Sequence, residues 1–102
     1  MDLDIKDMRL FLAIANERNL TRAAKKNGYT QSAASHILKN LEVELGFSLF
    51  SRSQKGLSLT DNGACLLPWV HQILTAAESF EQEAAFLRDL KTEQEEEEEE
   101  AI

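Results

Sequence analysis

The sequence predicts a mainly α-helical fold with one short β-hairpin and a long final helix. In the first half of the 102-residue chain, apolar residues recur at helical spacing in separate stretches. Only residues 47–59 show the two-residue alternation expected of strands, and a heptad pattern runs through residues 61–90. This length suits one compact domain rather than two.

The first helix is expected to begin after Asp4 and to end near Asn19. Asp4 has a side chain that can cap a helix N-terminus, and Asp7 stands in the first turn, where a negative charge suits the helix dipole. The apolar positions that define the buried face are Ile5, Met8, Phe11, Leu12 and Ala15.

Two further helices follow, with a tight turn between them. The second is expected to be very short, with Thr21 as its N-cap, because Gly28 tolerates the left-handed conformation of a helix end. The third is expected to begin after Thr30 and to close at Gly46. Its apolar stripe consists of Ala34, Leu38, Leu41 and Leu45. Two helices joined by a glycine-containing turn, the second one long and polar, are typical of a helix-turn-helix.

Residues 47–59 predict a β-hairpin. Leu49-Phe50 and the alternating Leu57-Ser58-Leu59 flank the polar, glycine-containing stretch 53–56. A hairpin directly after a helix-turn-helix is a wing. The predicted fold class is therefore mainly α: a winged helix-turn-helix with a short β-hairpin wing over residues 1–60, followed by a long C-terminal dimerisation helix.

This fourth helix is expected over residues 61–90, with Thr60 as its N-cap. At about 1.5 Å per residue it is ~45 Å long. Apolar residues with spacings of four and three form a predicted seam: Leu66, Val70, Ile73, Ala77, Phe80, Ala84 and Leu87. A domain of this size cannot cover the whole seam. Part of it is therefore expected to pack against a second copy of the chain, which makes a homodimer.

The net charge of −7 hides an asymmetry between the two halves of the chain. Residues 1–60 hold nine Lys and Arg against six Asp and Glu, whereas residues 61–102 hold two against twelve. The first half is therefore the candidate for phosphate contact. Residues 91–102 contain a run of six glutamates at 95–100, and such a density of like charges predicts an acidic, disordered tail.

A polar face of the third helix has the residue types that bind base edges in DNA. Gln can bond adenine through two hydrogen bonds, Ser can bond several bases, and His can donate to guanine or to a phosphate. The candidates are Gln31, Ser32, Ser35, His36 and Lys39 on this helix, Arg22 on the second helix, and Arg52 and Lys55 on the wing. Taken singly, each can instead be an ordinary surface residue. Together they converge on one surface, and double-stranded DNA is the expected partner.

The sequence gives no support to other classes of function. No nucleophile, base and orienting group can be assembled into an enzyme site, and no set of residues suits a cofactor or a small-molecule effector. Cys65 is single and His71 has no ligand partner at metal spacing, so neither a disulfide nor a metal is expected. No apolar run reaches the ~18 residues of a membrane span, and the N-terminus is acidic rather than a signal peptide. A cytoplasmic location is expected.

Six dispersed stretches form a specific pattern because they occur together and in order: Met8-Arg9-Leu10-Phe11, Leu20-Thr21-Arg22-Ala23-Ala24, Thr30-Gln31-Ser32-Ala33-Ala34-Ser35, Leu41-Glu42-Val43-Glu44-Leu45-Gly46, Leu49-Phe50-Ser51-Arg52 and Leu57-Ser58-Leu59-Thr60-Asp61-Asn62-Gly63. In these stretches, and from about residue 4 to residue 90, the chain resembles the N-terminal DNA-binding region of LysR-type bacterial transcriptional regulators.

The resemblance implies a winged helix-turn-helix followed by a linker helix that pairs with its partner, usually antiparallel. It also implies a homodimer bound to a partly palindromic operator. By position, the base-contacting residues would be Gln31, Ser32, Ser35 and His36. The backbone and wing contacts would be Thr21, Arg22, Lys39 and Arg52.

The chain departs from the family pattern at several places. The family often has Pro at Ser32, Arg or Lys at His36, and Leu at Asn27, and the first two changes bear on the operator sequence. Family members continue into a large effector-binding domain, which is expected to be absent here. Both an excised fragment and a short regulator without a sensor remain open.

An alternative function is a dimerising interaction module that does not bind DNA productively. Its motivation is the acidic tail, which can compete with phosphate for the basic surface. A further alternative is an antagonist that forms inactive mixed dimers with full-length relatives.

Overall fold

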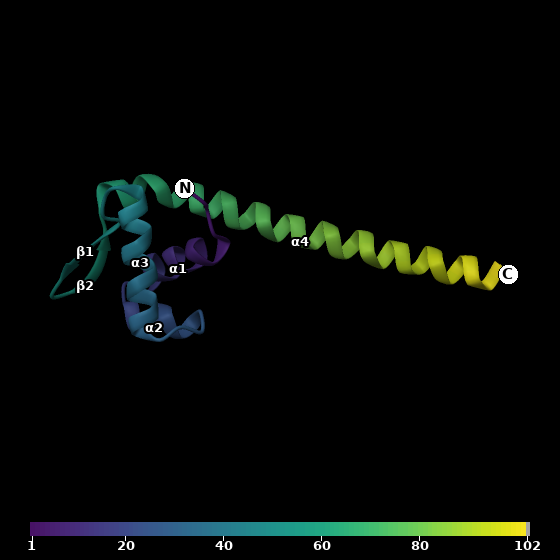
Figure 1. Cartoon of the computed structure of the whole chain (residues 1–102), viewed down its shortest axis with the longest axis horizontal. Helices are drawn as coiled ribbons and strands as arrows, with labels where there is room; N and C mark the ends of the chain where they lie inside the picture. The colour runs from purple at the N-terminus through teal and green to yellow at the C-terminus, as the bar shows by residue number, and fades with distance from the viewer. Residues whose placement is uncertain (102) are drawn as a thin grey trace.

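A computed structural model describes the backbone of residues 1–101 and the side chains of residues 1–91. The order of elements is α1 (Ile5–Glu17), α2 (Leu20–Lys26), α3 (Gln31–Leu45), β1 (Phe50–Ser53), β2 (Gly56–Leu59) and α4 (Asp61–Ala101). Helices α1 to α3 form a compact unit, the hairpin extends from one side of it, and α4 projects from the other side (Figure 1). The predicted fold class, a mainly helical winged helix-turn-helix with a long last helix, is confirmed.

The first helix begins as predicted and ends slightly earlier. The Asp4 side chain accepts a hydrogen bond of 2.9 Å from the Lys6 amide, as an N-cap does. Arg18 adopts the left-handed conformation, with φ of 54°, and its amide donates to the Ile14 carbonyl over 2.8 Å. This bend ends α1 at Glu17 rather than near Asn19.

The cap predicted for the second helix is wrong. Asn19, not Thr21, is the N-cap of α2, because its side-chain oxygen accepts from the Arg22 amide over 3.0 Å. Both residue types can cap a helix, and the bend at Arg18 places Asn19 where the first free amides of α2 begin. Thr21 lies inside the first turn instead.

Both predicted ends of the third helix are confirmed. The Thr30 hydroxyl accepts from the Ala33 amide over 3.1 Å, and Gly46 closes α3 with φ of 85°. These two caps delimit a helix of 15 residues, which is long enough to present one face to the core and the other to solvent.

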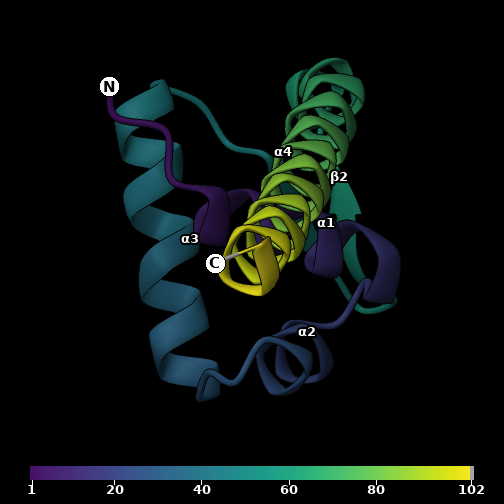
Figure 2. The ribbon, with the colours of Figure 1, turned by 90° about the vertical axis from the view of Figure 1, so that its right-hand side faces the viewer.

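The core forms where α1 lies between the other elements. Phe11, Leu10 and Ile14 of α1 are fully buried, and the Phe11 ring packs against Phe50 of β1 with centroids 5.5 Å apart. Burying a side chain of this size stabilises the fold by about 1.5–3 kcal/mol. The other buried apolar residues are Met8, Leu20, Ala23, Ala24, Ala34, Leu38, Leu41, Leu49, Leu57, Val70 and Leu74. Viewed along α4, α1 lies behind that helix in the middle of the domain, with α3 to the left and α2 below (Figure 2).

The wing is a two-stranded antiparallel hairpin whose register runs from Phe50 opposite Leu59 to Ser53 opposite Gly56. It is fastened to the turn between α1 and α2, because the Leu57 amide donates to the Arg18 carbonyl over 3.1 Å. Gly56 has φ of +107°, and a Cβ there would lie 2.7 Å from the same Arg18 carbonyl oxygen. Only glycine suits this position.

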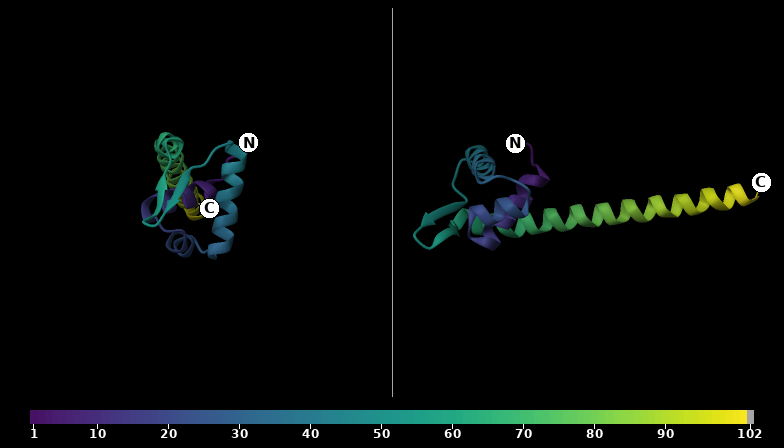
Figure 3. Two further views of the ribbon diagram at one scale, coloured as in Figure 1. Left: turned by 90° about the vertical axis from the view of Figure 1, so that its left-hand side faces the viewer. Right: turned by 90° about the horizontal axis from the view of Figure 1, so that it is seen from below.

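The first turn of α4 is anchored to the domain. The predicted cap at Thr60 is confirmed, since its hydroxyl accepts from the Gly63 amide over 3.0 Å and donates to the Ser48 carbonyl over 2.6 Å. Val70 and Leu74 then add to the core. Farther along, the Glu81 carboxylate of α4 forms an ion pair of 3.8 Å with Arg9 of α1. Beyond Glu81, α4 projects away from the domain (Figure 3), and the molecule measures 69 × 25 × 21 Å.

The helix continues to Ala101, past the end that the sequence predicted near Leu90. Glutamate is intrinsically a good helix former, and disorder was predicted from charge repulsion alone. The side chains of residues 92–102 lie outside the described part of the structure, so the role of the acidic tail stays a prediction. Within the described residues, no helix is apolar over a stretch long enough to cross a membrane.

Candidate nucleic-acid interface

Helix α3 has two faces of opposite character. Ala34, Leu38 and Leu41 are buried against the domain. The opposite face carries the polar residues singled out in the sequence, of which Ser35 is half-buried and the others are exposed: Gln31, Ser32, His36 and Lys39. Their hydrogen-bonding groups are therefore available to a partner along the N-terminal half of the helix.

A shallow hollow separates this face from the wing. We call it the α3–wing hollow, and it is lined by Leu20, Gln31, Ser32, Ser35, His36, Lys39 and Arg52. A second hollow adjoins it between the start of α2 and the wing, and shares Leu20, Gln31 and Arg52 with the first. Thr21 lies in this second hollow. The two hollows together make one concave surface.

Seven of the nine predicted DNA-contacting residues line this concave surface. The two that do not are Arg22 and Lys55, which are both exposed. Arg22 lies on α2, and Lys55 lies in the wing turn between β1 and β2. Figure 1 shows the wing beside α3, on the side of the domain away from α4.

The wing is fixed relative to α3 by one carboxylate. Glu42, near the end of α3, accepts hydrogen bonds from the Leu49 and Phe50 amides, over 2.5 Å and 3.4 Å. Charge-assisted bonds of this kind are stronger than neutral ones. The distance between the polar face of α3 and Arg52 is therefore set by the fold rather than by a free loop.

Charged groups are segregated along the domain. Asp4 and Asp7 at the start of α1 lie near Glu44 at the far end of α3, away from the hollow. Partial burial raises the pKa of Asp7, and repulsion by Asp4 and then Glu44 adds to the effect. The residues of the hollow lie instead at the N-terminal half of α3, where the helix dipole also favours an anion.

One basic residue of α2 is already engaged. Lys26 forms an ion pair with Glu17 of α1. The hydrogen bond from the Lys26 ammonium lowers the pKa of Glu17, and the positive charges of Lys26 and Arg22 act in the same direction. Lys26 therefore joins α1 to α2, whereas Arg22 keeps an exposed side chain.

Three residues at this surface were not predicted from the sequence. Arg18 and Asn19 line the second hollow, and Asn40 makes a hydrogen bond of 3.1 Å with His36. The spacing of four residues between His36 and Asn40 is the available sequence indication, because such residues are neighbours on a helix.

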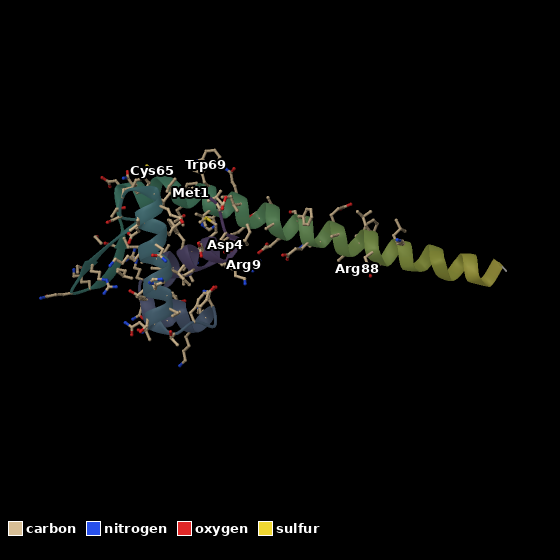
Figure 4. All side chains as sticks on the ribbon, viewed as in Figure 1. Met1, Asp4, Arg9, Cys65, Trp69 and Arg88 are labelled. Carbon is tan, nitrogen blue, oxygen red and sulfur yellow. The ribbon has the colours of Figure 1, made fainter. Side chains whose placement is uncertain are left out.

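The structure divides the predicted seam of α4 into two parts. Val70 is 3% exposed and packs in the domain's own core, and Leu66, Ile73 and Ala77 are half-buried beside it. Phe80, Ala84 and Leu87 are exposed, with Phe80 at 76%. Trp69, which was not included in the seam, is 61% exposed and points away from the domain (Figure 4).

Comparison with known proteins agrees with this architecture. The model of the family described as bacterial regulatory helix-turn-helix proteins, lysR family, matches residues 5–64. The HTH-type transcriptional regulator CzcR of Bacillus subtilis is 36% identical over 80 residues, which are 78% of this chain and 28% of that protein. The chain thus spans less than a third of the length of this curated relative.

Two solved structures extend the similarity to the fold. DarR of Vibrio fischeri, in complex with DNA, has a TM-score of 0.81 and 27% identity over 88% of this chain and 31% of that one. A CbnR_DBD–DNA complex has a TM-score of 0.73 and 29% identity, and covers 83% of this chain and 99% of that one. With 60 residues matched by the family model and the winged helix-turn-helix shared with these structures, the chain belongs to the lysR family of bacterial regulatory helix-turn-helix proteins.

Proposed function

We propose that the chain binds double-stranded DNA sequence-specifically as a homodimer and regulates transcription from a partly palindromic operator. The observation that carries this proposal is the concave surface between α3 and the wing, where polar and basic side chains gather. A major groove about 12 Å wide admits an α-helix, and the exposed face of α3 has base-reading groups along its first turns.

Each part of the surface suits a different part of DNA. Gln31 and Ser35, which line the hollow on α3, suit base edges, because amide and hydroxyl groups donate to and accept from bases. Lys39 and Arg22 suit phosphates, which position the protein without reading sequence. Arg52 and Lys55 on the wing suit the backbone or the adjacent minor groove.

The exposed stripe on α4 supports the homodimer. Trp69, Phe80 and Leu87 are separated by 11 and 7 residues, which is close to three and two turns of helix, so they share one face over about 27 Å. Large apolar side chains exposed along one face mark an interaction surface. A second copy of the same helix, laid alongside, covers this stripe and places two α3 helices on successive half-sites, about 34 Å apart or a multiple of that.

Selection of genomic DNA fragments by the purified chain at near-physiological salt tests the proposal. We expect enrichment of a partial palindrome whose half-sites are spaced by whole helical turns. A matched selection with Gln31→Ala, which leaves the core intact, should change the enriched sequence. A folded dimer that enriches no sequence would overturn the proposal in favour of an interaction module.

A further inference from the structure

His36 and Asn40 lie one turn apart on the exposed face of α3 and make a side-chain hydrogen bond. Asn40 Nδ2 lies 3.1 Å from His36 Nε2. The amide nitrogen of asparagine has two hydrogens and no free lone pair, so it can only donate. With the Asn40 amide in this orientation His36 Nε2 is the acceptor, and a neutral imidazole that accepts through Nε2 carries its proton on Nδ1.

We propose that Asn40 holds His36 in this tautomer, so that His36 presents an Nδ1–H donor to a hydrogen-bond acceptor on DNA, with guanine as the preferred base. The inference rests on the proposed function and goes further, because it names the class of base that one side chain reads. Asn40 is a positioning residue in this scheme, since His36 lines the α3–wing hollow and Asn40 does not.

The Nδ1 edge of His36 is free to serve a partner. The His36 side chain is exposed, and among residues 1–91 the bond from Asn40 is its one hydrogen bond. Without Asn40 the ring can carry its proton on either nitrogen, and the side chain can then donate or accept at the same edge. The bond from Asn40 removes this ambiguity.

Guanine matches a single donor better than any other base. In the major groove guanine has two acceptors, N7 and O6. Adenine places an N6 amino donor beside its one acceptor, thymine has only O4 beside a methyl group, and cytosine offers a donor. A phosphate oxygen has the same acceptor chemistry, but it carries no base information.

The tautomer is tested first, without DNA. Proton–nitrogen correlation spectra at pH 8, where an ordinary imidazole is neutral, distinguish a protonated from an unprotonated ring nitrogen. We expect His36 of the wild type to be protonated on Nδ1. Asn40→Asp is isosteric but can only accept when ionised, so Nε2 should gain a proton; Asn40→Ala should give a mixture. His71, the other histidine of the chain, should not change. A wild-type ring protonated on Nε2, or one insensitive to Asn40, would overturn the proposal.

Base preference is tested by selection from a randomised duplex pool. We expect Asn40→Ala to lower the preference for guanine at one half-site position by about three- to tenfold, the worth of one hydrogen bond. Replacing that guanine with 7-deazaguanine should cause a similar loss in the wild type and little further loss in Asn40→Ala. Gln54→Glu, which adds charge on the wing and not on α3, is the control for Asn40→Asp and should weaken all sequences alike.

The outcomes separate this inference from the proposed function. Equal weakening of all sequences by Asn40→Ala would assign the contact to a phosphate and overturn the assignment to guanine. If an operator is enriched but none of its guanine preferences depends on Asn40, this inference alone is overturned. A wild type that enriches no operator would overturn the proposed function, and this inference with it.

Discussion

Gln31, the first residue of α3, is one of the three residues that line both hollows. Gln31 lines the concave surface, whereas the exposed Arg22 lies on α2 and lines neither hollow. The two residues therefore differ in what they can recognise. An amide reads a base through directed hydrogen bonds, and a guanidinium at the margin interacts with the charge of the phosphates.

Replacing each of these residues should have a different effect. We expect Gln31→Ala to lose about 1–3 kcal/mol of discrimination at one base pair. Arg22→Ala should weaken binding to every sequence and reduce the slope of affinity against salt. Titration of the operator and of a scrambled duplex at several salt concentrations measures both effects. Identical behaviour of the two variants would show that the reading face is misplaced.

The ion pair between Glu17 and Lys26 predicts a pH dependence of stability. The Lys26 ammonium lowers the pKa of Glu17 from its ordinary value of 4.5. A carboxyl with a lowered pKa in the folded state stabilises the fold above its unfolded pKa, and this contribution is lost as pH falls through the folded pKa.

We therefore expect Glu17→Gln to be less stable than the wild type at neutral pH, with the difference vanishing in acid. The contribution is small because the Lys26 side chain is 66% exposed to solvent. Urea unfolding of both proteins across the acid range measures the difference. A difference that stays constant into the acid range, where the carboxyl becomes protonated in both states, would contradict the assignment.

At the scale of elements, the wing depends on its ties to the helices. Glu42 joins α3 to the start of β1, and the Arg18 carbonyl joins the α1–α2 turn to β2. Both ties use backbone amides of the wing, so the hairpin keeps its position without a large core of its own. A two-stranded hairpin in isolation is marginally stable at best.

Removing the Glu42 carboxylate should release this part of the wing. We expect Glu42→Ala to cost about 1–3 kcal/mol, because two partly buried amides lose their acceptor. Hydrogen exchange should accelerate at the Leu49 and Phe50 amides. Glu44→Ala, two residues along the same helix, is the matched control, since Glu44 is exposed and repels Asp7. Unchanged exchange in Glu42→Ala would show that the wing is held by other contacts.

At the scale of the whole molecule, the concave surface and the proposed dimer contact lie on different elements. The concave surface lies between α3 and the wing, and the dimer contact lies on α4. The domain buries Val70 and Leu74 of this helix, and Arg9 of α1 forms an ion pair with Glu81. We expect Phe80→Glu to abolish the dimer and leave the domain folded, because the Phe80 side chain is exposed in the single chain. Sedimentation should then show a monomer. The circular dichroism spectrum should show an unchanged helix content. Gln82→Glu is the charge control, because Gln82 is also exposed. A dimer that survives Phe80→Glu would exclude this contact surface.

The acidic tail acts on the molecule as a whole through its charge. Residues 93–102 contain seven glutamates, which can compete with phosphate for the basic surface. We expect deletion of these residues to tighten DNA binding, most strongly at low salt where screening is weak. Equal affinities of the deleted and full-length chains at low salt would exclude this competition.

The positions of most elements follow from the sequence because local features specify them. Thr30 and Gly46 delimit α3 by capping chemistry, and the alternation of residues 57–59 beside a polar turn specifies the wing. The polar face of α3 was predictable for the same reason, since a helical repeat with one apolar stripe leaves the opposite side to solvent. Most of the candidate interface was therefore visible before the structure.

Where two neighbouring residues suit the same role equally well, only the tertiary structure decided which of them fills it. Asn19 and Thr21 can both cap α2, and the left-handed bend at Arg18 selects Asn19. On α4 a heptad pattern cannot distinguish two adjacent faces of one helix. Packing against α1 buries Val70 and leaves Phe80 and Trp69 exposed. Sequence periodicity determines that a helix has an apolar side, but which part of that side is covered depends on where the rest of the chain lies.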